Sequence, residues 1–536
     1  MNRRSFLALS GTYLLARTQA ATPGPVVTTE AGRLRGTTDG AVQIFRGVPY
    51  GASTAGANRF QPPAKPAPWP GIREATAYGP RAYQPFRPMI PEIGDALTGS
   101  GPMSEDCLRL NVFTPGTSGR RPVMVWFHGG GQRTGSGNSV FYDGRELARR
   151  HDVVVVTTTH RLNAFAYLWL AGLPGTGARF ASSTNLGLRD LTLALHWVRD
   201  NISRFGGDAG RVTIFGQSGG GGKTAMLTGF PAAKGLFHRA IIMSTLADTA
   251  VTGLEPARAI EAAELLLRRL TIAPADAGRL LDVPPERIVE ALAAGPDLSL
   301  RFVPVVDGTL LPAHPFSPAS PLSATVPILT GSNECEGIPY GNPDDAYWRE
   351  EPADETALRA RVRQILSVGD DEAQRVIALY RSNRPRETAA DLAAIVAGDA
   401  SDLRHASFAI AAAKHAQGRA PVYLYRFNWR SPVRAGKLRS MHGMELPFVF
   451  DHPDLLGALT GTGEERHRLA RDMSTAWAAF ASTGNPNHSG IPKWDAWTPD
   501  RWSTMVFDSP TRAVDDPWGD ERRAISAARR RAARAG

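Results

Sequence analysis

The chain has 536 residues, of which 42% are hydrophobic and 21% are charged, the balance of an ordinary globular protein. These proportions exclude a fibrous or an intrinsically disordered chain. The formal net charge of +10 is concentrated at the two ends. Residues 1–21 hold three arginines and no acid, and residues 520–536 hold six arginines against Asp520 and Glu521. The charge therefore does not indicate a nucleic-acid-binding surface.

The first residues resemble a twin-arginine export signal. Arg3 and Arg4 precede a short apolar stretch over 6–16, with small residues at 18, 20 and 21. The stretch is too short to span a bilayer, and no other stretch approaches the roughly 20 apolar residues of a transmembrane helix. We expect residues 1–21 to be a cleaved signal and the protein to be periplasmic or secreted. A frayed basic N-terminus is the alternative.

In chain order, short β-like pieces over 26–60 are followed by a loop over 79–103 that is rich in Pro and Gly. Continuous apolar runs then predict buried parallel strands at 123–127, 153–157, 212–215, 240–243, 326–329 and 422–427. Apolar residues spaced by three and four predict a helix over 186–205, and further helical stretches cover 257–270 and 358–380. This alternation predicts an α/β sheet with helices on both faces. The helix-rich segments 250–320 and 340–415 are interpreted as insertions, because the sheet resumes after each.

Ser218 lies where an apolar strand breaks and a helix begins. The surrounding Gly216-Gln-Ser-Gly-Gly220 fits a nucleophile elbow, a strained turn that exposes a serine hydroxyl at a helix N-terminus. A glycine-rich turn without chemical meaning is the plainer interpretation. Gly222-Lys223-Thr224 also resembles the end of a phosphate-binding P-loop, but Gln217 stands where that motif needs its first glycine. An NTPase is therefore the weaker hypothesis.

A serine hydroxyl needs a base, an orienting acid and donors for an oxyanion. His128-Gly-Gly-Gly131 follows directly on the strand ending at 127, where a glycine loop could direct backbone N–H groups at the nucleophile. This position favours an oxyanion hole over a flexible turn.

Several ordered blocks then resemble one family, the type-B carboxylesterases of the cholinesterase-like α/β-hydrolases. The blocks are 104–112, 160–163, 185–190, 197–208, 331–337, 441–450 and 483–487, and the resemblance covers about 26–507. It implies an α/β-hydrolase fold with a single domain over 22–519 and a basic tail over 520–536. It also implies a carboxylic ester hydrolase that works through an acyl-enzyme, with no cofactor and no metal. The partner is a small-molecule ester, and we expect a monomer or weak homodimer.

Carried over by position, the resemblance implies Ser218 as nucleophile, Glu336 as triad acid and His442 as base, in the chain order expected of this fold. It implies Gly130, Gly131 and Gly219 as oxyanion donors. Glu334 is the rival acid. A catalytically silent binding protein of the same fold is the non-enzyme alternative, although every catalytic position here is filled.

The chain also departs from the family pattern. Gln217 and Gly219 flank the serine where Glu and Ala are usual, which argues against a preference for cationic esters. Gln132 replaces an aromatic residue after the glycine loop. Residues 244–246 read Ser-Thr-Leu in place of Ser-Gly-Ser, which puts a secondary serine in doubt.

Cys107 and Cys335 are expected to be free thiols. The C-terminal segment 524–535 is expected to be a solvated or frayed tail, with a basic amphipathic helix as the alternative.

Overall fold

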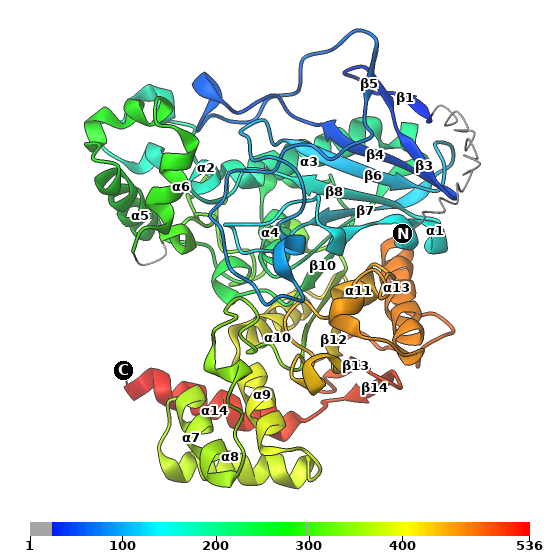
Figure 1. The fold of residues 1–536 in the computed structure, drawn as a ribbon, viewed down its shortest axis with the longest axis vertical. Helices are drawn as coiled ribbons and strands as arrows, with labels where there is room; N and C mark the ends of the chain where they lie inside the picture. Colours follow the sequence, from blue (N-terminus) through cyan, green and yellow to red (C-terminus); the bar gives the residue numbers. More distant parts are fainter. Residues whose placement is uncertain (1–23, 296–297, 536) are drawn as a thin grey trace, which may run out of the picture.

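The computed structural model describes residues 24–295 and 298–535, so the expected export signal lies outside the described residues. Eleven strands form one sheet, in the spatial order β14-β13-β12-β11-β10-β9-β7-β8-β6-β4-β3 (Figure 1). The strands are β3 (Thr37–Asp39), β4 (Val42–Pro49), β6 (Arg109–Thr114), β7 (Arg121–Phe127), β8 (Val154–Thr159), β9 (Gly207–Gln217), β10 (Arg239–Met243), β11 (Ile328–Asn333), β12 (Val422–Phe427), β13 (Ser503–Phe507) and β14 (Arg512–Asp515). A separate small sheet pairs β1 (Val26–Thr28), β2 (Arg33–Arg35) and β5 (Ile72–Glu74).

The central strands, from β8 through β7, β9, β10, β11 and β12 to β13, are parallel, and the strands at both edges pair antiparallel. Phe127 at the end of β7 is in register with Gly216 near the end of β9, and Gly216 is in register with Ile242 of β10. Carboxyl ends of neighbouring parallel strands therefore meet at one edge of the sheet, where α/β proteins place their sites.

Alternate side chains of these strands enter two separate cores, one on each face of the sheet. Val125 and Ile214 belong to one buried cluster, and Trp126 and Phe215 belong to the other. This explains why the strands are continuous apolar runs and not alternating ones. The predicted α/β architecture is confirmed.

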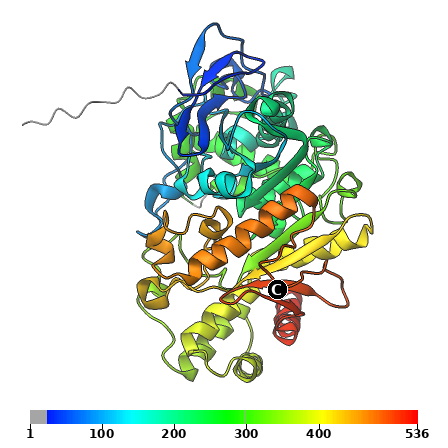
Figure 2. The ribbon, with the colours of Figure 1, turned by 90° about the vertical axis from the view of Figure 1, so that its right-hand side faces the viewer.

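The helices are α1 (Arg145–His151), α2 (Asn163–Tyr167), α3 (Leu186–Asn201), α4 (Gly219–Thr228), α5 (Pro256–Arg269), α6 (Pro285–Ala293), α7 (Glu355–Leu366), α8 (Asp370–Asn383), α9 (Ala389–Ala400), α10 (Asp402–Ala416), α11 (Leu446–Val449), α12 (Gly457–Thr460), α13 (Glu465–Thr483) and α14 (Gly519–Ala535). Helix α13 packs on β7 and β9 from one face and runs obliquely across the middle of the molecule in Figure 2, while α3, α4 and α10 pack on the other face. No described helix combines the length and apolar character needed to cross a membrane.

Two sequence-based expectations differ from the structure. The helical stretch over 358–380 is two helices, α7 and α8, because the chain turns at Ser367, which has φ of 53°. The basic C-terminal segment is not a solvated tail. It forms α14, in which Glu521, Ile525 and Ala528 have 0% exposure. Glu521 lies 3.0 Å from Arg384, so a buried ion pair fixes the start of this helix.

Candidate active site

Ser218 occupies a strained turn between β9 and α4. Its backbone angles are φ 59° and ψ −127°, a region that costs a non-glycine residue on the order of 1–3 kcal/mol. The Ser218 N–H donates to the carbonyl of Met243 at 2.9 Å, and the Gly222 N–H donates to the carbonyl of Ser218 at 3.0 Å. These bonds to β10 and to the first turn of α4 hold the strained conformation, which the elbow pattern predicts.

The glycines around Ser218 are required by the close approach of the loop that follows β7. A Cβ atom on Gly219 would lie 1.9 Å from the carbonyl oxygen of Gly131, and one on Gly220 would lie 1.9 Å from that of Phe127. Contacts this short are forbidden, so only glycine fits at either position. The departure from the family pattern at Gly219 therefore has a packing reason in this chain.

Glu336 and His442 are brought together from two loops at the carboxyl edge of the sheet. Oε2 of Glu336 lies 2.6 Å from Nδ1 of His442, and both side chains are nearly buried. The backbone N–H of Asn333 donates to the other carboxylate oxygen at 2.7 Å. Burial lowers the basicity of His442, but the charge and hydrogen bond of Glu336 outweigh it and raise the pKa of His442 above its usual value. Burial likewise opposes ionisation of Glu336, yet His442 keeps the pKa of that carboxyl low.

Glu334, the rival acid, points into a different environment. Its carboxylate lies 2.8 Å from Arg384, 3.3 Å from Arg426 and 3.0 Å from Arg430. Burial would raise the pKa of Glu334, but the three guanidinium groups lower it to about 2. Glu334 thus belongs to a buried arginine network, and Glu336 is the acid that contacts His442.

Sequence reasoning missed a second buried carboxyl beside the pair. Glu445 has 0% exposure, accepts from Asn333 Nδ2 at 2.5 Å and accepts from Ser244 Oγ at 3.3 Å. Burial and the neighbouring Glu336 raise the pKa of Glu445 to about 7. Its place three residues after His442 inside the 441–450 block was the available signal. Ser244, whose supporting role the departure at 244–246 put in doubt, donates to Glu445 here and also helps to lower the pKa of Glu336.

Gln217 also contacts the histidine. Its amide nitrogen lies 3.3 Å from Nε2 and 3.4 Å from Nδ1 of His442. Ser218, His442 and Gln217 line one small cavity of about 30 Å³, together with Gly129 and Gly130. The nucleophile candidate, the base candidate and the glycine loop therefore share one space.

The glycine loop leaves backbone donors free beside this cavity. Gly130 and Gly131 have φ of 90° and 68°, conformations that favour glycine. No group in the described part of the chain accepts a hydrogen bond from the N–H of either residue. Gly219 is the first residue of α4, where helix N–H groups have no intrahelical acceptor. The three donors named from the sequence thus lie on adjoining backbone.

The P-loop hypothesis is not supported by the position of its lysine. Gly222, Lys223 and Thr224 lie inside α4, and Lys223 is fully buried. Its amine donates to the backbone carbonyls of His128 at 3.0 Å and of Gly131 at 3.2 Å. A side chain held in this way does not reach a phosphate.

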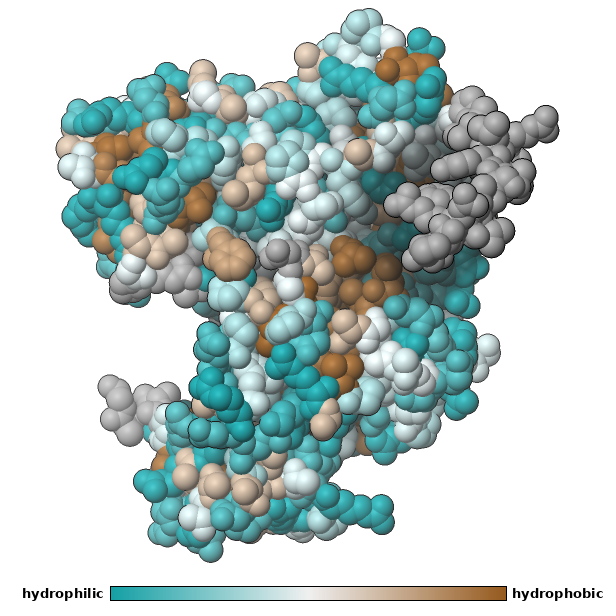
Figure 3. Space-filling model, in the orientation of Figure 1, coloured by the Kyte–Doolittle hydropathy of each residue, from teal (hydrophilic) through white to brown (hydrophobic). Residues whose placement is uncertain are grey.

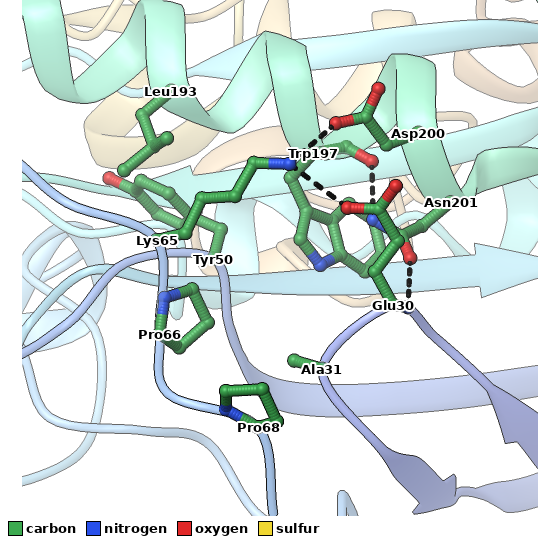
Figure 4. A pocket seen from close by; sticks show the side chains of 10 residues that line it. All are labelled: Glu30, Ala31, Tyr50, Lys65, Pro66, Pro68, Leu193, Trp197, Asp200 and Asn201. Carbon is green, nitrogen blue, oxygen red and sulfur yellow. Dashed lines mark hydrogen bonds and ion pairs between the residues drawn. The ribbon is translucent and has the colours of Figure 1, made fainter.

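A larger cavity, of about 260 Å³, lies elsewhere, and none of the described serine, cysteine or histidine residues lines it (Figure 4). It is lined by Trp197 and prolines and crossed by Lys65, which lies 3.0 Å from Glu30 and 3.1 Å from Asp200. By contrast, the cavity at Ser218 has apolar lining from Ile93, Leu97, Leu446 and Leu459. Apolar residues also gather on the surface near α11, in the middle of the face drawn in Figure 3. The smaller cavity is the candidate active site, because Ser218 and His442 line it.

Cys107 and Cys335 are both free and buried, which confirms that they are not bonded to each other. Burial raises the pKa of each thiol to about 12, so neither is a reactive thiolate at neutral pH. Among the described residues, no group of three or more His, Cys, Asp or Glu side chains is arranged to hold a metal ion.

A mostly parallel sheet with a serine elbow at its carboxyl edge defines an α/β-hydrolase. The chain belongs to the carboxylesterase family, whose model matches residues 23–524. It is 34% identical to the para-nitrobenzyl esterase of Bacillus subtilis (strain 168) over 510 residues, which cover 93% of this chain and 98% of that protein.

Solved structures agree with this assignment. A carboxylesterase of Geobacillus stearothermophilus matches with a TM-score of 0.77 and 35% identity, over 93% of this chain and 99% of that one. An esterase from Clostridium hathewayi that can hydrolyse aliphatic aromatic polyesters matches with a TM-score of 0.79 and 32% identity, over 94% and 98%. The expected family and fold are confirmed, and the chain is a carboxylic ester hydrolase.

Proposed function

We propose that this enzyme cleaves carboxylic esters through a covalent acyl-enzyme on Ser218, with His442 as general base and Glu336 as the orienting acid. The observation that supports this assignment best is the 2.6 Å contact between Glu336 and His442 Nδ1 beside the cavity that holds Ser218. A proton on Nδ1 that is donated to Glu336 leaves Nε2 as the acceptor for the serine proton.

The reaction then follows from these positions. As Ser218 Oγ attacks the ester carbonyl carbon, His442 Nε2 takes the hydroxyl proton, and the carbonyl oxygen becomes an oxyanion. The N–H groups of Gly130, Gly131 and Gly219 stabilise that oxyanion. When the intermediate collapses, His442 returns the proton to the leaving alcohol and the acyl group stays on Ser218. A water molecule, deprotonated by His442, attacks the acyl carbonyl and forms a second tetrahedral intermediate. Its collapse breaks the bond to Ser218 Oγ, which takes the proton back from His442, and releases the acid.

The imidazolium formed in each step is stabilised by its buried partner. Glu336 raises the pKa of His442, so the histidine holds the proton while the oxyanion exists. The carboxyl of Glu445 lies beside Glu336 and has a pKa of about 7. In its protonated form, Glu445 adds no second negative charge next to the carboxylate of Glu336.

The substrates are expected to be neutral esters. Gln217 and the apolar side chains of Ile93, Leu97 and Leu446 line the cavity, and the cavity lining in the described residues includes no carboxylate. The apolar lining favours acyl groups without charge.

Active-site labelling tests the proposal. The protein is incubated with a fluorophosphonate, digested and analysed by mass spectrometry, alongside a Cys-directed reagent as a control for unspecific labelling. The proposal requires a single adduct on Ser218 and loss of p-nitrophenyl ester hydrolysis in proportion to labelling. Full activity after complete labelling, or an adduct elsewhere, would contradict it.

We propose further that residues 22–519 form one catalytic domain on which helix α14 packs through α8 and α9. We also propose that residues 1–21 direct export and that the mature enzyme is a monomer or weak homodimer. The export assignment depends on the twin arginines and the apolar stretch that follows them. Intact-mass analysis of protein recovered outside the cytoplasm of an exporting host should give an N-terminus near Ala21 or Thr22. An unprocessed Met1 would refute export through this signal.

A further inference from the structure

Lys223 lies in the first half of α4, on the same helix that begins after Ser218, and its side chain has 0% exposure. Its amine contacts both ends of the glycine loop at 128–131. The donated hydrogen bonds go to the carbonyl of His128 at 3.0 Å and to that of Gly131 at 3.2 Å. A single side chain thus ties the loop to the helix that carries the nucleophile.

This lysine has no acidic partner among the described residues. The titratable groups that face it are His128 and His160, whose rings lie 4.7 Å apart and whose pKa values burial lowers far below the usual range. Burial alone lowers the pKa of Lys223 to about 7. An amine buried without a carboxylate is costly, so its two hydrogen bonds to the glycine loop, the polar contacts it makes within the described part of the chain, have to offset that cost.

Gly219 completes the arrangement. Because it lacks a Cβ atom, the carbonyl of Gly131 can approach α4 to a distance that a side chain would forbid, and there it meets the Lys223 amine. A glycine at 219 and a buried lysine at 223 are both unusual in a helix. Both are needed for the same contact, the hydrogen bond from Lys223 to the carbonyl of Gly131.

We propose that Lys223 is a positioning residue for the oxyanion hole, whose amine fixes the backbone of the glycine loop so that the N–H groups of Gly130 and Gly131 face the ester oxygen at Ser218. This inference depends on the proposed function. Lys223 does not touch the substrate, and it acts through the loop. Displacement of oxyanion donors by about 1 Å is enough to lose on the order of 100-fold in rate.

The chain offers a matched control in Lys414 of α10. Its side chain is also fully buried, and its amine donates to the carbonyls of Ser323 at 2.7 Å and Ala324 at 2.8 Å, away from the glycine loop. Burial lowers the pKa of Lys414 to about 8. Lys223→Met and Lys414→Met thus remove comparable buried amines, and only the first contacts the loop.

Three measurements on the full-length protein separate positioning from stability. We expect Lys223→Met to lower kcat by about 100-fold with little change in KM. We also expect it to lower, by a similar factor, the affinity for a trifluoromethyl ketone inhibitor, which forms a tetrahedral oxyanion on the serine. We expect Lys414→Met to keep kcat and inhibitor affinity within about twofold of wild type. Hydrogen exchange of the peptide covering 128–135 should accelerate in Lys223→Met only.

Equal losses of kcat in both variants, or wild-type kcat and wild-type loop exchange in Lys223→Met, would overturn the proposal. If Lys223→Met does not fold, Lys223→Gln, which keeps two N–H donors on a shorter side chain, must show the same faster loop exchange and weaker inhibitor binding. Loop exchange does not require ester hydrolysis. An inactive wild type would therefore refute the proposed function, while the exchange result would still decide the role of Lys223.

Discussion

The carboxylate of Glu336 and the imidazole of His442 are joined by a hydrogen bond of 2.6 Å between residues 106 positions apart in the chain. The other carboxylate oxygen accepts the backbone N–H of Asn333, so the carboxylate is held at both ends. This geometry selects the tautomer of His442 whose Nε2 can accept a proton.

We expect Glu336→Gln to reduce kcat/KM for p-nitrophenyl esters by about 10⁴-fold, because an amide cannot hold the Nδ1 proton and stabilise the imidazolium in the same way. The folded structure should survive, since glutamine has nearly the same shape. Steady-state kinetics and circular dichroism on the same preparation check both parts. A variant that retains a tenth of wild-type activity would show that Glu336 does not orient the base.

Glu334→Gln is the matched comparison two residues away, and we expect it to cost stability and leave catalysis largely intact. Glu334 faces Arg384, Arg426 and Arg430, and removing one side of a buried ion pair typically costs about 3–5 kcal/mol. Because the folded pKa of Glu334 is lowered to about 2, its stabilisation is present above the unfolded value near 4.5 and is lost as the pH falls toward 2.

Urea unfolding at several pH values measures this difference. The gap in unfolding free energy between wild type and Glu334→Gln should be full at pH 7 and narrow below about pH 4.5. A gap that does not change with pH would mean that the Glu334 charge does not contribute. A collapse of kcat in the folded variant would reassign the acid.

The acid side of the pH profile should depend on Glu336. Hydrolysis needs neutral His442, and Glu336 raises the pKa of His442, so activity falls as the pH drops through that raised value. In Glu336→Gln the pKa returns toward lower values, and we expect the residual activity to persist to lower pH than in wild type. The test is to measure kcat/KM between pH 5 and 9 in a buffer of constant ionic strength. If the activity of Glu336→Gln fell at a higher pH than that of wild type, Glu336 would not be the group that raises the pKa of His442.

Gln217→Glu should create a preference for cationic esters that the wild type lacks. The Gln217 amide lies 3.3 Å from His442 Nε2, so a carboxylate there would stand close to a bound alcohol group. A charge pair at about 4 Å is worth about 1–4 kcal/mol between effective dielectrics of 80 and 20, or roughly tenfold or more in selectivity.

The comparison uses kcat/KM for butyrylthiocholine against an isosteric neutral thioester. Wild type should prefer neither ester by more than about tenfold, and Gln217→Glu should favour the choline ester. Gln217→Met, which removes the amide without adding charge, is the control. A strong choline preference in wild type would show that another group attracts the cation.

The sequence predicted the sheet well because its central strands are buried on both faces, which produces continuous apolar runs such as 123–127 and 422–427. It did not predict β13 or α13, although Leu469, Met473, Trp477 and Phe480 of α13 recur at the spacing of three and four that is typical of a helix with one buried face. The break between α7 and α8 depends on one left-handed residue, Ser367, which a periodicity argument does not detect.

Motifs predicted that Ser218, Glu336 and His442 would lie close together. In the structure Ser218 and His442 line one small cavity, and Glu336 contacts His442. The positions of Glu445 and Lys223 were not predictable, because they depend on long-range contacts with Asn333 and with the glycine loop. For the C-terminal segment the sequence favoured a solvated tail, with a basic amphipathic helix as the alternative, because its composition is basic and the burial of α14 depends on the contact between Glu521 and Arg384.

The central claim is that Ser218 forms the acyl-enzyme, and Ser218→Ala tests it most directly. We expect kcat/KM for p-nitrophenyl esters to fall by several orders of magnitude, with an unchanged unfolding midpoint, because the nucleophile of a cooperative group is lost. Under the same conditions, mass spectrometry of acid-quenched wild type should find the acyl group on the peptide that contains Ser218. Retention of more than about a tenth of wild-type activity by Ser218→Ala, or an acyl group trapped elsewhere, would contradict the account.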